Sequence, residues 1–131
     1  MIINIPQQFN FASIMAYNEH LADRVRRIFE EKKVSNIEEK KMMGGLTFMV
    51  NEKMCIGIVK DDLMVRLNPD DHDDALQKIG ARTMDFTAKP MRGYIFVNPE
   101  GVDKEVELED WVQTALIFNV LAKVSKKSKK K

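Results

Sequence analysis

Residues 40–59, KKMMGGLTFMVNEKMCIGIV, combine a glycine pair with the only cysteine of the 131-residue chain. A glycine-rich loop binds phosphate where it precedes a helix, and a cysteine thiolate is a nucleophile. Gly44 and Gly45 instead precede an alternating apolar run that is typical of a strand. No residue beside Cys55 in the sequence favours its thiolate form. The sequence therefore predicts a turn or bulge at the glycines and an inert, partly buried thiol.

Residues 70–74, DDHDD, contain the residue types of a metal site. Successive residues of a helix point in different directions and do not converge on one ion. The glycine and glutamate of a calcium-binding EF-hand loop are also missing. His20 and His72 are the only histidines, and neither has a partner at a metal-binding spacing such as HExxH. We expect neither a metal nor a cofactor here, and interpret the aspartates as the charged start of a helix.

Catalytic residues cannot be assigned from the spacing of the sequence. No Ser-His-Asp or paired-carboxylate arrangement can be assembled without assuming proximity. The segment DFTAKPMRG, residues 85–93, offers two cations and one carboxylate in a loop, where binding residues often occur. Alternatively, this segment is a crossover whose Met84, Phe86 and Met91 fill the core. The chain is therefore expected to be non-catalytic, with both interpretations of this loop open.

The elements that position these residues follow from hydrophobic periodicity. Apolar residues at helical spacing predict a helix over residues 18–33, capped by Asn18. Strict alternation with two intervening turns predicts a three-stranded antiparallel meander over residues 46–67. A capped, proline-initiated helix, a strand and a final helix are predicted over residues 68–80, 93–99 and 108–123.

This order predicts an α+β fold. Residues 37–42, which are only weakly apolar, add a further strand. The expected architecture has two layers: a mainly antiparallel sheet of four to five strands, with three helices covering one face (α-β3/4-α-β-α). A chain of this length fits one domain, which we place at residues 15–122. Residues 1–14 are interpreted as an N-terminal extension, and residues 123–131 as a disordered lysine-rich tail.

Composition restricts the compartment and the partners. One cysteine excludes an internal disulfide and fits a reducing compartment, so the cytoplasm is expected. No apolar run approaches the roughly 18 residues of a membrane span. The tail holds six of the 21 basic residues, and the body is therefore acidic. Nonspecific nucleic-acid binding by the tail would make the logarithm of the binding constant fall with the logarithm of the salt concentration with a slope of about −5. A solvated solubility tail is the alternative. The candidate residues are Lys126, Lys127, Lys129, Lys130 and Lys131.

Four segments together carry a family pattern: MAYNEHLADRVRRIF, KKMMGGLTFMVNEKMCIGIVKDDLMVRL, TMDFTAKPMRGYIFVNPEGV and LEDWVQTALIFNVL. The order and spacing of MxGGLxFxVN, MCxGI, LMVR, MDF, PMRGY and WV are specific as a set. Over residues 15–123 the chain resembles the N-terminal domain of the TfoX/Sxy family. The resemblance implies a secretion-chaperone-like fold and a stand-alone, single-domain bacterial member.

The resemblance also implies a role in transcription. The family takes its name from regulators of natural competence, which promote transcription of DNA-uptake genes alongside the cyclic-AMP receptor protein and carry a second, helical domain. The family has no established catalytic residues. Met43 stands where the family usually has phenylalanine, Ala88-Lys89 where it has Gly-Arg, and Tyr94 where it often has tryptophan. Lys89 keeps the charge of arginine but not its bidentate fork.

The family pattern implies a shared surface, although the same residues can equally shape turns. We predict a non-catalytic interaction domain that binds a protein partner, the transcription machinery being the candidate, as a monomer or homodimer without membrane contact. The alternatives are nucleic-acid binding through the tail, and an unrecognised enzyme or small-molecule binder using the loop around Lys89 and Arg92. The candidate binding residues are Gly44, Gly45, Asn51, Arg66, Asp85, Lys89, Pro90, Arg92 and Gly93.

Overall fold

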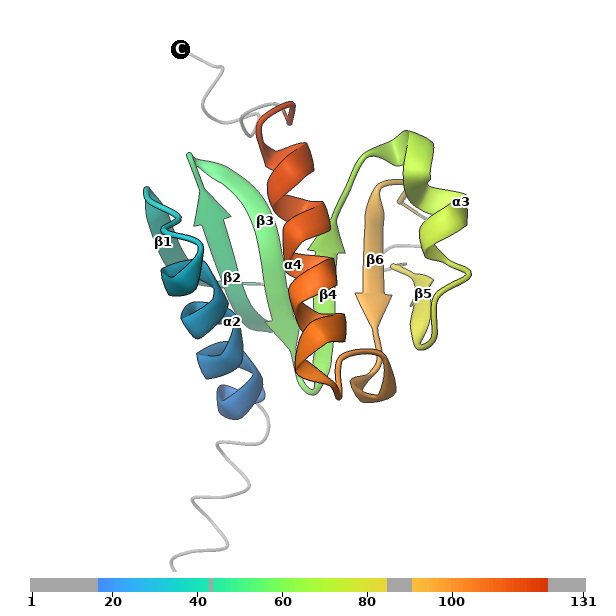
Figure 1. Ribbon diagram of the computed structural model, residues 1–131, viewed down its shortest axis with the longest axis horizontal. Coiled ribbons are helices and arrows are strands. Elements are labelled where there is room, and N and C mark those ends of the chain that lie inside the picture. Colours follow the sequence, from blue (N-terminus) through green and yellow to red (C-terminus); the bar gives the residue numbers. More distant parts are fainter. Residues whose placement is uncertain (1–16, 43, 85–90, 123–131) are drawn as a thin grey trace, which may run out of the picture.

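The computed structural model describes residues 17–42, 44–84 and 91–122, in which the apolar runs form one six-stranded antiparallel sheet (Figure 1). The order across the sheet is β1-β2-β3-β4-β6-β5. The strands are β1 (Ile37–Met42), β2 (Gly45–Val50), β3 (Lys53–Val59), β4 (Asp62–Arg66), β5 (Ala81–Thr83) and β6 (Tyr94–Val97). The predicted α+β class is confirmed, with six strands in place of four to five.

The additional strand is β5, which lies at one edge of the sheet. No strand was predicted between residues 80 and 93, but Thr83 pairs with Ile95 of β6. β5 is only three residues long, and Ala-Arg-Thr has no alternating apolar signal because an edge strand buries little of its surface. The predicted strand over residues 37–42 is confirmed as β1, at the opposite edge.

Three α-helices accompany the sheet in the described residues: α2 (Glu19–Glu31), α3 (His72–Ala75) and α4 (Glu105–Asn119). The predicted cap of α2 is confirmed, because Asn18 Oδ1 accepts a hydrogen bond from the Leu21 amide at 2.9 Å. α3 follows a 3₁₀ turn, Pro69–Asp71, in which Asn68 accepts from the Asp70 amide. The helix predicted over residues 68–80 is therefore present but ends earlier, and only His72–Ala75 form a regular α-helix.

α4 starts earlier and ends earlier than the predicted range of 108–123. The Glu107 carboxylate accepts a hydrogen bond from the Lys104 amide, so the first turn is stabilised before the apolar face begins. The apolar run continues past the helix end at Asn119. Leu121, which falls within the predicted helix, lies beyond the end of α4 and is 67% exposed.

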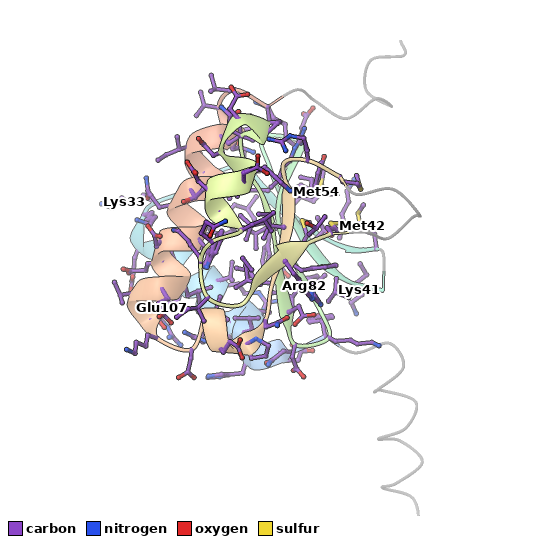
Figure 2. The ribbon with its side chains drawn as sticks, turned by 90° about the vertical axis from the view of Figure 1, so that its right-hand side faces the viewer. Lys33, Lys41, Met42, Met54, Arg82 and Glu107 are labelled. Atoms are coloured by element: carbon purple, nitrogen blue, oxygen red, sulfur yellow. The ribbon has the colours of Figure 1, made fainter. Side chains whose placement is uncertain are left out.

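The main core lies between the helices and one face of the sheet. Val25, Ile28 and Phe29 of α2 and Leu108, Trp111 and Val112 of α4 are all buried. They pack against the alternating residues of β2, β3, β4 and β6, and Ala75 of α3 joins the same cluster. Figure 2 shows the helices on one side of the sheet, as predicted.

The other face of the sheet carries a second, smaller apolar cluster built around Met64, Met84 and Phe96. Its methionines are used as fillers, since the Met64 methyl lies 3.0 Å from the position that a Cβ at Gly57 would occupy. The Arg82 guanidinium lies 4.9 Å from the Phe96 ring centroid and binds Asp62 at 2.6 Å.

Candidate functional site

The predicted site residues lie at opposite ends of the sheet. Gly44 and Gly45 form the turn from β1 into β2, whereas Asn51 follows β2 at the other end. β2 and β4 run in the same direction, because each is antiparallel to β3. Arg66 therefore ends β4 on the side of Asn51, and Gly93 lies there too because Tyr94 pairs with Arg66. The glycine pair does not share a site with the other four predicted residues that the structure describes, Asn51, Arg66, Arg92 and Gly93.

The glycines shape the backbone at these turns. Gly44 has φ +76°, in the left-handed region that favours glycine. A Cβ at Gly45 would lie 2.0 Å from the Ile58 carbonyl oxygen of β3. The turn interpretation of this pair is therefore confirmed. A role in binding stays a prediction for both residues.

Arg92 and Gly93 are held by Pro69, His72 and Asp73 of the aspartate-rich helix start. Arg92 binds Asp73 at 3.3 Å and donates to the Pro69 carbonyl at 2.9 Å. The Gly93 amide donates to Nδ1 of His72 at 2.9 Å, and His72 is 4% exposed. This histidine therefore anchors the start of β6. Nothing in its sequence neighbourhood indicates the contact, because the two residues are 21 positions apart.

Arg66 links the second sheet face to α4. Its guanidinium carbon lies 5.6 Å from the ring centroid of Tyr94 and 5.8 Å from that of Phe118. One guanidinium nitrogen also reaches the Met54 carbonyl at 3.5 Å. A cation in contact with two aromatic rings stabilises the packing of β4, β6 and α4.

Cys55 faces the main core and is 1% exposed. Its position follows from a register shift between β2 and β3, where Phe48 pairs with Ile56 and Met49 pairs with Met54. Burial raises the pKa of the Cys55 thiol to about 12, against a smaller opposing effect of the Arg66 charge. The thiol was predicted to be inert and partly buried. It is more deeply buried than predicted, and an inert role is consistent with this environment, since the protonated form dominates near neutral pH.

We expect Cys55 to resist alkylation in the folded chain at mildly alkaline pH and to react fully in urea. Because folding raises its pKa from 9.0 to about 12, its stabilising contribution is complete below pH 9 and declines as the pH rises towards 12. Iodoacetamide labelling followed by intact-mass measurement tests this. Fast labelling of the folded protein would contradict the buried position.

The β2–β3 turn and the C-terminal end of α4 lie at the same end of the sheet (Figure 1). Asn51 joins a cluster of amide side chains that connects them. Its Nδ2 donates to Oδ1 of Asn119 at 3.3 Å, and its Oδ1 accepts from Asn36 at 3.0 Å. Asn119 is 3% exposed and also donates to the Val50 carbonyl at 3.1 Å. Lys53 donates to the Asn119 carbonyl at 2.8 Å. The cluster fixes both the turn and the end of the helix.

Beside this cluster lies an exposed apolar ridge formed by Ile117, Val120 and Leu121. The three side chains are 61%, 74% and 67% exposed, and their i, i+3, i+4 spacing places them on one side of the helix end. A hollow of about 440 Å³ adjoins the ridge at Val120. The hollow is lined by Lys32, Val34, Ser35, Val50, Asn51, Gln113, Leu116, Asn119 and Val120.

Sequence reasoning missed the ridge because it predicted one helix through residue 123 and gave no separate role to the apolar residues at its end. The available signal was the unbroken apolar run over residues 115–118, continued by Val120 and Leu121. Such a run is wider than the single stripe that a surface helix buries. Of the predicted site residues, Asn51 lies in the hollow beside the ridge.

Comparison with known protein families identifies the fold. The model of the TfoX N-terminal domain matches residues 30–118, from the end of α2 to the last turn of α4. The chain belongs to this family. The match to the TfoX N-terminal domain includes all six strands. Of the three ridge residues it includes only Ile117, because Val120 and Leu121 lie beyond residue 118. No curated protein and no solved structure matches the chain.

Two further properties of this TfoX N-terminal domain bear on its chemistry. In residues 17–42, 44–84 and 91–122, no helix is long and apolar enough to cross a membrane. The same residues contain no group of three or more His, Cys, Asp or Glu side chains placed to hold a metal ion. Asp85, Lys89, Pro90 and the lysines of residues 123–131 lie outside the described part of the chain, and their assigned roles stay predictions.

Proposed function

We propose that this TfoX N-terminal domain is a non-catalytic protein-interaction domain that takes part in transcription regulation in the cytoplasm through contacts with the transcription machinery. The observation that best supports the proposal is the exposed apolar ridge of Ile117, Val120 and Leu121. Three large apolar side chains exposed next to one another have an unfavourable interaction with water, which a partner surface would relieve. Competence regulation is the process in which the family's named regulators act.

The hollow beside the ridge restricts the orientation of a bound partner, because it presents apolar and polar groups at fixed positions. Val34, Val50 and Leu116 supply apolar lining, and Asn51 and Asn119 supply polar groups already engaged with one another. Lys32 is the one charged residue of this lining. The partner that fits is an amphipathic helix whose apolar side chains pack on the ridge and whose acidic flank faces Lys32.

The experiment measures binding of purified RNA polymerase holoenzyme and of cyclic-AMP receptor protein to the immobilised full-length chain. The test variant carries Ile117→Ser and Leu121→Ser, which remove two of the three apolar side chains of the ridge without adding charge. The matched control is Val106→Ser, because Val106 is 66% exposed in the first turn of the same helix. Far-UV circular dichroism of each variant checks that the fold is retained.

We expect the wild type and Val106→Ser to bind one of the two proteins with equal affinity. The ridge variant should bind about a hundredfold more weakly, because burying each large apolar side chain contributes about 1.5 kcal/mol or more. Equal affinity of the ridge variant would exclude the ridge as the contact. Absence of binding by the wild type to both proteins would contradict the proposed place in transcription.

A further inference from the structure

Among the residues that the structure describes, β1 forms one edge of the sheet. Five of its six residues are exposed, and Met42 is half-buried. Among the residues that the structure describes, β2 is the strand that pairs with β1, and no other strand does. The unpaired amide and carbonyl groups of an edge strand are a template for another strand.

The outward-facing backbone groups of β1 can be assigned from one hydrogen bond. The Asn51 amide donates to the Asn36 carbonyl at 3.0 Å, so this carbonyl points towards β2. In a trans peptide the following amide, that of Ile37, points the opposite way. The alternation of an antiparallel ladder then directs the amide and carbonyl of Ile37, Glu39 and Lys41 outward.

We propose that β1 pairs antiparallel with β1 of a second copy of this chain, with a two-fold axis through Glu39, so that one sheet continues across both copies. Two residues that pair across such an axis have their side chains on the same face of the sheet. Because side chains alternate between the faces, the two residues are an even number of positions apart, and the axis lies at a residue rather than between two residues. With the axis at Glu39, Ile37 pairs with Lys41 of the other copy. All three outward-facing residues then exchange backbone hydrogen bonds.

The charges of β1 favour this register. Glu38 lies opposite Lys40 of the other copy, and Lys40 lies opposite its Glu38, which gives two ion pairs at positions where cross-strand side chains are closest. An axis through Lys40 would instead place two lysines opposite each other. With that axis, Ile37 would also lie opposite a position beyond the end of β1 in the other copy, and its outward-facing backbone groups would have no partner in that strand.

Glu39 lies on the axis and meets Glu39 of the other copy. The resulting repulsion is reduced, because each carboxylate is bound by Arg26 of its own α2. Arg26 Nε and one terminal nitrogen lie 2.8 and 2.9 Å from the two carboxylate oxygens. These hydrogen bonds hold the pKa of Glu39 below its usual value. Lys41 of the other copy lies diagonal to Glu39 on the same face and adds a second positive charge.

The test measures the mass of the full-length chain in solution by sedimentation velocity over a range of concentrations. A contact between two six-residue strands is smaller than a standard interface of about 1,600 Å², so we expect a dissociation constant in the micromolar range. Glu38→Lys and Lys40→Glu each convert both ion pairs to like-charge pairs. Each should weaken the dimer about thirtyfold.

The double variant Glu38→Lys, Lys40→Glu exchanges the two charges, restores complementarity and should dimerise like the wild type. Mixing the two single variants should give a heterodimer for the same reason. A monomeric wild type, or single variants that dimerise as well as the wild type, would overturn the proposal. All of these positions are exposed, and far-UV circular dichroism verifies the fold.

The register is tested by disulfide cross-linking. Glu39→Cys should form an intermolecular disulfide under mild oxidation, because residues on the two-fold axis are directly opposite. Lys40→Cys is the matched control and should cross-link at least tenfold more slowly. Preferential cross-linking of Lys40→Cys would overturn the register. Cys55 does not interfere, because it is buried.

Discussion

Replacing Phe48 by alanine is expected to lower the free energy of unfolding by about 4 kcal/mol. Phe48 of β2 is fully buried. Its ring meets Phe29 of α2 edge to face, with centroids 5.5 Å apart and an interplanar angle of 86°. The Arg26 guanidinium lies 5.9 Å from the same ring. Alanine would leave a cavity between the sheet and α2 and remove both aromatic contacts.

Urea unfolding followed by circular dichroism measures this loss. Val106→Ala is the control, because Val106 is 66% exposed and its truncation should change stability by no more than about 0.5 kcal/mol. A loss below about 1 kcal/mol for Phe48→Ala would mean that α2 does not pack on β2 as described.

Replacing Gly45 by alanine is expected to cost about 3 kcal/mol, whereas the same change at Gly44 should cost about 1 kcal/mol. The Gly45 Cβ would lie 2.0 Å from the Ile58 carbonyl oxygen, so β2 and β3 would have to separate. The Gly44 Cβ would meet no atom within 4 Å, and the cost there comes only from the left-handed backbone at φ +76°.

The two glycine variants are compared by urea unfolding under the same conditions. Each serves as the control for the other, because they are adjacent in sequence and differ in the space around the added methyl. A larger loss at Gly44 than at Gly45 would contradict the close approach of β2 and β3. A larger loss at Gly45 than at Gly44 would support a structural role for the glycine pair, in which the pair sets the register of the sheet.

The strands of the sheet were predictable where apolar residues alternate along the chain and every second side chain enters the core. Leu46, Phe48 and Val50 place every second side chain in the core, and the turns at the ends of β2 and β3 confirm the predicted meander. Asn18 was recognisable as a cap because a capping side chain bonds to an amide only three residues further along the chain, here that of Leu21. These are local patterns, and local patterns are visible in a sequence.

The parts that could not be predicted depend on contacts between distant residues. Asn51 and Asn119 are 68 positions apart, and the sequence does not indicate that their amides meet. Apolar residues continue past Asn119, so the end of α4 was also placed too late. β5 was missed because its pairing with β6, rather than its composition, makes it a strand.

The candidate site was predicted only in part for the same reason. Family resemblance identified Asn51, which lies in the hollow beside the ridge. The exposed position of Ile117 and Leu121 depends on where α4 ends, and that end is fixed by the hydrogen bonds around Asn119. Hydrophobic composition alone does not separate a buried apolar residue from an exposed one.

The most direct test of the interaction role compares the ridge variant, Ile117→Ser with Leu121→Ser, with Val106→Ser in binding to RNA polymerase holoenzyme and cyclic-AMP receptor protein. All three positions are exposed on α4 or the turn that follows it, so their effects on folding should be small and equal. A protein-interaction domain that uses the ridge predicts about a hundredfold weaker binding for the ridge variant alone. Equal binding by both variants would contradict that role for the ridge.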